Sequence, residues 1–194
     1  LPISCVSTGI AGTFGDYTYE VNSPETNTVT ITGYTGAGGD IVIPSVMDGK
    51  SVTGIGSRAF YERASLTGVS IPNSVTDIML SAFSRCSSLQ SVNIPGSVSE
   101  IGVGAFAYCN AMTNAVIGNG VTTIGQAAFR DCGSLPDIFI PESVTSIDKW
   151  VFDVCTSLTS IAVAPGNPNY SSNDGVLFNK SQSTLVLYPA GRTA

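Results

Sequence analysis

A unit of 23 residues recurs along most of this sequence without any change in spacing. Three of its columns are isoleucine, phenylalanine and cysteine, in the order Ile71, Ile94, Ile117, Ile140; Phe83, Phe106, Phe129, Phe152; and Cys86, Cys109, Cys132, Cys155. Self-similarity at one fixed period of roughly 20 to 50 residues is typical of solenoid proteins. The sequence therefore predicts stacked coils, in which each column becomes one strip of a continuous core.

One unit can be divided into three segments by its apolar spacing. Val92 to Ile94 alternates between apolar and polar residues, which predicts a strand with one buried face that ends at Pro95. Val98 to Ile101 is too short for a helix and predicts a second short strand or a turn. Ala105 to Met112 has approximately helical spacing, so we expect a single helical or 3₁₀ turn there.

The two ends of the chain depart from the repeat. Residues 1–40 contain alternating segments at 17–21 and 28–32, which predict a β-hairpin that caps the solenoid. Residues 41–164 are expected to form about five repeats. Residues 165–194 predict a loop followed by a second hairpin, with strands at 176–178 and 185–188. Terminal units of a solenoid are expected to be atypical, because they must cover exposed core and open strand edges.

The composition favours strands and excludes several kinds of partner. Only 11% of the residues are charged, against about 25% in ordinary globular proteins. The many β-branched residues favour strands over helices. A net charge of −6 without a basic patch argues against nucleic acid and anionic membranes as partners. No apolar run approaches the roughly 18 residues of a membrane span.

The residues needed for catalysis are not grouped in this sequence. There is no histidine, so the commonest general base is absent, and the 14 carboxylates are scattered over different columns. The cysteine column has parallel side chains, which do not converge on zinc or on one another. We predict buried, reduced thiols that fill the core. We expect no enzyme activity, no cofactor and no metal; the role of Cys5 stays open.

The repeat closely resembles the BspA-like leucine-rich repeat family. The segment 71–78 reads IPNSVTDI, the segment 82–89 reads AFSRCSSL, and 140–147 reads IPESVTSI. The match covers about 41–163; Arg63, Met79 and Gly118 depart from the family's cysteine, glycine and proline. The resemblance implies a mostly-β leucine-rich-repeat solenoid, with parallel strands and short helical turns. It also implies a secreted or cell-surface protein that adheres to host proteins, extracellular matrix or neighbouring cells.

One face of the main strands is expected to remain open. Its two outward columns read Ser70, Asn93, Val116, Phe139, Ala162 and Gly68, Ser91, Asn114, Asp137, Ser160. Polar residues give way to apolar ones toward the C-terminus, and exposed apolar patches often mark interaction sites. The candidate partner-binding residues are Asn93, Asn114, Val116, Asp137 and Phe139. The alternative is that Val116 and Phe139 simply suit a strand, or that a terminal hairpin covers Phe139.

A second candidate patch lies on the side of the expected helical turns. It contains Met79, Leu80, Val103 and Trp150. Trp150 could contact a partner, or it could shield the C-terminal end of the core, which is the interpretation we favour. One period of 23 residues also separates Glu62 from Arg85 and Arg130 from Asp153, so we expect these pairs to form ion pairs between coils.

These features predict a non-catalytic, extracellular or cell-surface protein that binds a protein, matrix or glycan ligand through its open sheet face. The alternative is a structural subunit that self-associates end to end, because solenoid ends offer open strand edges. The two hypotheses differ in whether the terminal hairpins cover those ends. The chain begins at Leu1 without a methionine, which indicates either a removed signal peptide or a fragment of a longer repeat array.

Overall fold

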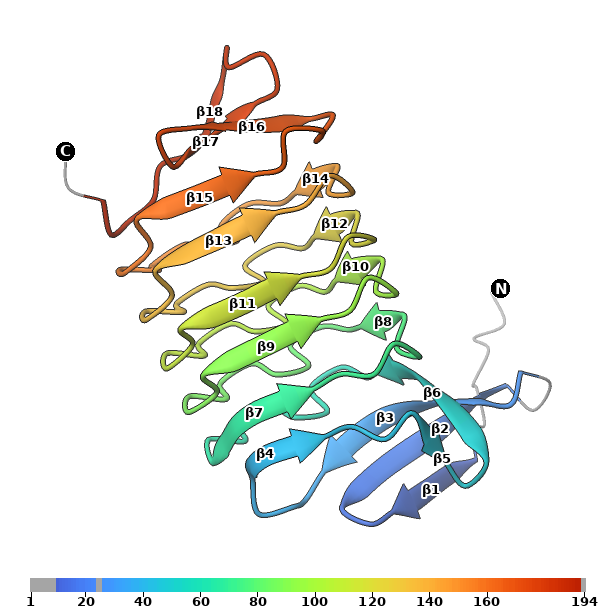
Figure 1. Cartoon of the computed structure of the whole chain (residues 1–194). Helices are drawn as coiled ribbons and strands as arrows, with labels where there is room; N and C mark the ends of the chain where they lie inside the picture. The colour runs from blue at the N-terminus through green and yellow to red at the C-terminus, as the bar shows by residue number, and fades with distance from the viewer. Residues whose placement is uncertain (1–9, 24–25, 193–194) are drawn as a thin grey trace, which may run out of the picture.

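The protein is a stack of coils that each contribute one strand to a front sheet and one to a back sheet (Figure 1). The computed structural model describes residues 10–23 and 26–192. Over these residues every regular element is a strand, which confirms the expected mostly-β solenoid. In the described part of the chain, no helix is long and apolar enough to cross a membrane.

The front sheet is built from the main strand of each coil. Its strands are β4 (Gly39–Val42), β7 (Leu66–Ser70), β9 (Ser91–Ile94), β11 (Asn114–Ile117), β13 (Asp137–Ile140) and β15 (Ser160–Val163), all parallel. Hydrogen-bonded pairing runs from β4 to β11 and again from β13 to β15. The break has a local cause. The backbone N–H groups of Gln90 and Thr113 each donate to a carbonyl oxygen of the preceding coil. The next residue at this position of the repeat is Pro136, which has no backbone N–H and cannot make this hydrogen bond.

The back sheet consists of very short parallel strands. They are β6 (Lys50–Ile55), β8 (Asp77–Ile78), β10 (Glu100–Ile101), β12 (Thr123–Ile124) and β14 (Ser146–Ile147), and β5 (Val46–Met47) pairs antiparallel with β6. Of the two alternatives expected for this segment, a short strand or a turn, the strand is the one present. Each pair of coils aligns residues one period apart, such as Ile78 with Ile101.

The third side of each coil is made of turns, and the expected helical turn is absent there. In the coil 79–89, the backbone N–H groups of Ala82, Ser84 and Cys86 each donate to the carbonyl oxygen three residues earlier, and each of these hydrogen bonds closes a turn. Ser81 and Arg85 have φ angles of 53° and 64°, in the left-handed region that breaks a helix. The intervening N–H groups bond to the next coil instead. Consecutive turns place apolar residues about three positions apart, as a helix does. The spacing of apolar residues alone therefore does not distinguish a run of turns from a helical turn.

The core consists of the repeated columns. The rings of Phe60, Phe83, Phe106, Phe129 and Phe152 stack, with centroids 4.7 to 5.8 Å apart. The four thiols of the cysteine column are free and buried, and each donates to a phenylalanine carbonyl oxygen 3.1 to 3.3 Å away. Burial raises the pKa of Cys86 to about 12 and that of Cys155 to about 11. These thiols are therefore protonated and unreactive at neutral pH.

The N-terminal end is closed by antiparallel strands. β2 (Tyr17–Ser23) and β3 (Thr28–Tyr34) form the expected hairpin, and β1 (Ala11–Phe14) adds an outer strand that we did not predict. β3 continues the back sheet through parallel pairing with β6. The rings of Tyr17 and Tyr34 pack against Phe60, so the phenylalanine stack ends on two tyrosines. Cys5 lies outside the described residues.

The C-terminal end is closed by a small antiparallel sheet. It contains β16 (Tyr170–Asn173), β17 (Val176–Asn179) and β18 (Leu185–Leu187). The expected hairpin corresponds to β17 and β18, whereas the segment that we read as loop contains β16. Three of the four residues of β16 are polar, so its sequence lacks the alternation of a half-buried strand; pairing with β17 and the packing of Tyr170 on the core hold it in place.

Candidate binding face

The open face of the front sheet presents alternate residues of parallel strands. In β11 and β13 the residues Ala115 and Ile138 point into the core, and Val116 and Phe139 point outward. Phe139 is 51% exposed and Val116 is 46% exposed. Val116 and Phe139 occupy the same position of the repeat in two neighbouring coils, so their side chains form the apolar centre of this face.

Polar side chains surround that apolar pair. Asn93 lies opposite Val116 in the register of β9 and β11, and Asn114 lies opposite Ser91. Asp137 is the corresponding residue at the start of β13, beside Ser160. Asn93, Asn114 and Asp137 are all exposed, so the five predicted residues lie on one surface. The arrangement offers an aromatic anchor with hydrogen-bonding groups at its edge.

The C-terminal sheet does not cover this surface. Phe139 keeps half of its area exposed although β13 pairs with β15, the strand that leads into β16. The face is also interrupted between β11 and β13, where Pro136 removes a ladder hydrogen bond. Val116 and Phe139 lie on either side of that interruption.

One further apolar residue belongs to the same column. Val42 of β4 lies opposite Ser70 of β7 and is 74% exposed. The gradient that we described, from polar residues at the N-terminus to apolar ones at the C-terminus, is therefore wrong at its first position. The match of Ile43-Pro44 to Ile71-Pro72 already places Val42 in the outward column.

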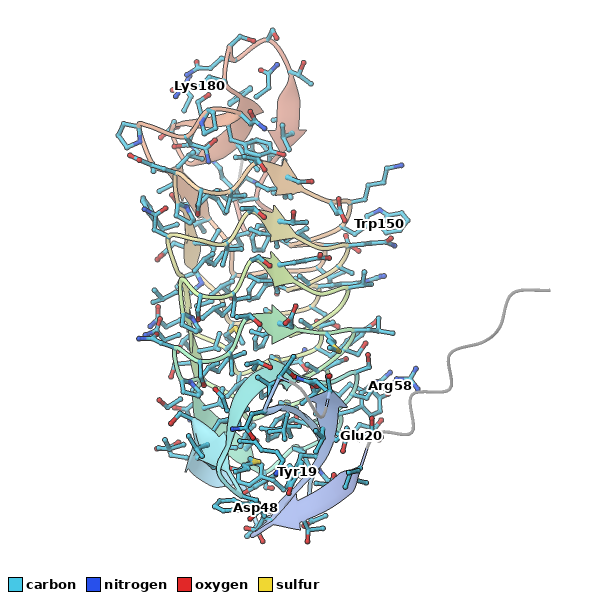
Figure 2. The ribbon with its side chains drawn as sticks, turned by 90° about the vertical axis from the view of Figure 1, so that its right-hand side faces the viewer. Tyr19, Glu20, Asp48, Arg58, Trp150 and Lys180 are labelled. Carbon is cyan, nitrogen blue, oxygen red and sulfur yellow. The ribbon has the colours of Figure 1, made fainter. Side chains whose placement is uncertain are left out.

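The turn side carries the second predicted patch. Met79, Leu80 and Val103 are exposed around a shallow hollow of about 270 Å³, which the carboxylates of Asp77 and Glu100 also line. Trp150 is 56% exposed and points away from the stack, so it does not shield the core as we expected (Figure 2). Every residue of its column has a positive φ, and Arg58 in that column points outward as well.

The predicted ion pairs between coils are confirmed. Arg130 and Asp153 approach to 3.3 Å, and Arg85 and Glu62 approach to 3.9 Å. Both pairs are about half exposed, so each contributes at most about 1 kcal/mol. Among the described residues, no three carboxylate, thiol or imidazole side chains gather as metal ligands would.

Comparison with protein families gives a clear result. A model described as "BspA type Leucine rich repeat region" matches residues 49–182 in six copies, one more than the about five repeats that we predicted. The chain belongs to the BspA-type leucine-rich repeat family. Neither this family nor the names of the similar structures indicate an enzyme. A comparison with curated proteins found no match.

Solved structures of bacterial leucine-rich repeat proteins share the fold. The T. pallidum leucine-rich repeat protein is 34% identical with a TM-score of 0.72, over 77% of this chain and 70% of that one. A leucine-rich cell surface protein from Faecalibacterium prausnitzii is 28% identical, with a TM-score of 0.59, over 95% of this chain and 63% of that one. The pneumococcal vaccine antigen PcpA is 23% identical, with a TM-score of 0.75, over 96% of this chain and 57% of that one.

Proposed function

We propose that this chain is a non-catalytic module of a secreted or cell-surface protein, which adheres to a protein, matrix or glycan ligand through its open sheet face. The observation that carries the proposal is the exposed pair Val116 and Phe139 on a flat surface held by parallel strands. Large aromatic side chains at the centre of a rigid surface dominate the binding energy of many interfaces.

Two properties of the surface support binding over catalysis. The face is the outer surface of parallel strands, with Val116 and Phe139 exposed on it, which suits a macromolecular ligand. Its polar rim consists of Asn93, Asn114 and Asp137, which can hydrogen-bond to peptide or sugar groups. Similar structures carry names that refer to a cell surface protein and to a vaccine antigen, which is the support for the proposed location.

End-to-end self-association has less support from the ends of the stack. At the N-terminus β3 and β4 already pair with the first coil, and tyrosine rings lie on its phenylalanine. At the C-terminus Asn169 Nδ2 donates to Thr145 O, and Ile147 N donates to the Tyr170 hydroxyl. These contacts occupy backbone groups through which a second copy would extend the back sheet.

Substitution of Phe139 tests the binding face. A panel of immobilised matrix proteins and glycans is screened with the wild-type chain, and Phe139→Ala is then measured against every ligand found. We expect its affinity to fall at least about 10-fold, because an exposed aromatic anchor is worth more than about 1.4 kcal/mol. Val46→Ala, an exposed apolar residue of the back sheet, should bind as the wild type does.

The same screen includes Val103→Ala on the turn side. If Val103→Ala weakens binding and Phe139→Ala does not, the turn side is the binding surface and the proposal is wrong.

A further inference from the structure

The turn side of the stack contains a regular ladder of backbone hydrogen bonds. In each coil, three alternate N–H groups donate to three alternate carbonyls of the following coil, at 2.7 to 3.0 Å. The donors are Arg58, Phe60, Glu62; Ser81, Phe83, Arg85; Gly104, Phe106, Tyr108; and Ala127, Phe129, Asp131. All of these N–H groups therefore point toward the C-terminal end of the stack. Each coil after the first supplies the carbonyl oxygens that accept hydrogen bonds from the N–H groups of the coil before it.

The last coil has the donors without the acceptors. Trp150, Phe152 and Val154 occupy the donor positions, and none of their N–H groups has a hydrogen-bond partner among the described residues. Buried backbone N–H groups are almost always paired, and Phe152 is only 2% exposed. Its unpaired N–H, aligned with those of the more exposed Trp150 and Val154, therefore points to a place where carbonyl groups can bind. Their spacing is that of the ladder below them.

The chain bypasses this position. After β15 it enters the antiparallel sheet β16–β18, and it returns to the stack at Gly191, whose N–H donates to Leu158 O at 2.8 Å. Leu158 lies beyond the last turn segment, so the carbonyl row that would cover Trp150 to Val154 is missing. β18 stands at the side of this gap.

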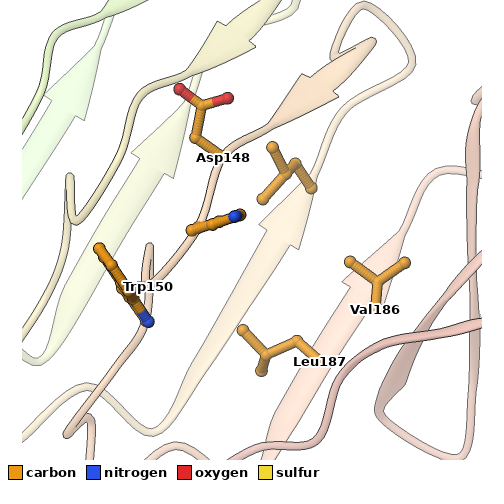
Figure 3. A pocket seen from close by; sticks show the side chains of 6 residues that line it. Asp148, Trp150, Val186 and Leu187 are labelled. Carbon is orange, nitrogen blue, oxygen red and sulfur yellow. The ribbon is translucent and has the colours of Figure 1, made fainter.

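A cavity of about 510 Å³ lies next to the first of these donor residues, Trp150, between residues 147–150 and β18 (Figure 3). Asp148 and Trp150 lie on one side of it and Val186 and Leu187 on the other, as Figure 3 shows. The indole of Trp150 and the side chain of Val154, 43% exposed, add apolar surface next to the unpaired donors. The site thus combines peptide-directed donors with apolar walls.

A second copy of the chain does not match this site. The complementary carbonyl row of a second copy belongs to its first coil, and β1 to β3 extend past that coil at the N-terminal end of the stack (Figure 1). The segment that fills the site in earlier coils carries a fully buried apolar residue at its middle carbonyl, namely Ala82, Ala105, Ala128 or Val151. An apolar side chain of alanine or valine size therefore fits that position.

We propose that the C-terminal end of the turn ladder binds a short segment of another polypeptide, with an alanine or valine at its centre. Alternate carbonyls of that segment accept hydrogen bonds from the N–H groups of Trp150, Phe152 and Val154. The mode is related to the addition of a strand to a sheet edge, in which the main chain gives affinity and a side-chain pocket gives specificity. It is independent of the front face formed by Val116 and Phe139.

The probe is a synthetic, end-capped peptide with the sequence of residues 124–131, IGQAAFRD, which fills the equivalent position in an earlier coil. Trp150 is the only tryptophan, so its fluorescence reports binding directly. We expect a saturable change in emission at one peptide per chain. At saturation, amide hydrogen exchange at Trp150, Phe152 and Val154 should slow at least about 10-fold, while the already bonded amides of the coil before do not change.

A matched pair of variants controls for non-specific apolar binding. Val154→Asp should weaken the peptide at least about 10-fold, and Val103→Asp, at a valine of equal 43% exposure, should not. Three results would overturn the proposal. These are unchanged exchange at the three amides with saturating peptide, equal weakening by both variants, and slow exchange in the free chain. In the last case, dependence on protein concentration would identify a second copy as the occupant, and independence would show that the chain itself closes the gap.

Discussion

A single polar residue ends the stack at its C-terminus. Position 167 follows Val75, Val98, Val121 and Val144 in a buried column, and it holds an asparagine that is fully buried. Asn167 Nδ2 donates to Pro141 O at 2.8 Å and to Val144 O at 2.9 Å, and its Oδ1 accepts from the N–H groups of Asn169 and Tyr170. The side chain thus replaces part of the backbone that a further coil would supply.

Asn167→Ala should therefore destabilise the chain by about 2 to 4 kcal/mol, because it leaves buried carbonyls and amides unpaired. Asn110→Ala is the control, since Asn110 is exposed and also makes two side-chain hydrogen bonds to the next coil. Its expected effect is within about 0.5 kcal/mol. Urea unfolding followed by circular dichroism measures both. Equal stability losses in the two variants would contradict the capping role of Asn167.

Repeat spacing predicts burial and contact between coils well at single positions. The thiol column, the phenylalanine stack and the Arg130–Asp153 pair all lie where a 23-residue period puts them. Backbone conformation is not encoded in the same way. Trp150 points outward because its column has a left-handed backbone, and neither its size nor its spacing reveals that.

The turn between β11 and β12 packs closely against the preceding coil at Gly118 and Gly120. Gly118 stands where other units have proline, and its N–H donates to Ile94 O, a bond that proline cannot make. A Cβ atom at Gly120 would lie 1.9 Å from Gly96 O of the preceding coil. Such a distance requires the backbone of one coil to move away from the other.

Gly120→Ala should destabilise the chain by about 1 to 3 kcal/mol, the usual cost of overpacking. Gly133→Ala is the matched control, because a Cβ there meets its nearest atom, Thr156 Oγ1, at an ordinary 3.7 Å. We expect the control to be neutral or slightly stabilising, since alanine restricts the unfolded chain more than glycine does. Thermal unfolding distinguishes the two, and a neutral Gly120→Ala would mean that the coils are less tightly stacked than described.

Elements differ in how far the sequence predicts them. The main strands and the short back strands follow from alternation and from the position of proline. The expected helical turns are wrong, because a run of turns also repeats at about three residues. β16 escaped detection because its residues are polar and its partner is local. The interruption between β11 and β13 was predictable from Pro136 alone, once the residues before it are known to donate across coils.

The molecule as a whole combines one repeated core with two different ends. At the N-terminus, β3 pairs with the back sheet, β4 pairs with the front sheet, and tyrosines cover the aromatic stack. At the C-terminus, Asn167, Asn169 and Tyr170 satisfy much of the exposed backbone. Only the turn ladder lacks acceptors there, over the described residues. These ends are consistent with a module that presents its face to a ligand and does not polymerise.

The most direct test of that account is the mass of the chain in solution. Light scattering over a hundredfold range of concentration, with negative-stain microscopy of the same samples, distinguishes a closed module from a filament subunit. We expect one species of 20.0 kDa at every concentration, because the strand edges that would join two copies are already paired. A mass that grows with concentration, or filaments on the grid, would contradict the account and make the structural-subunit hypothesis the better one.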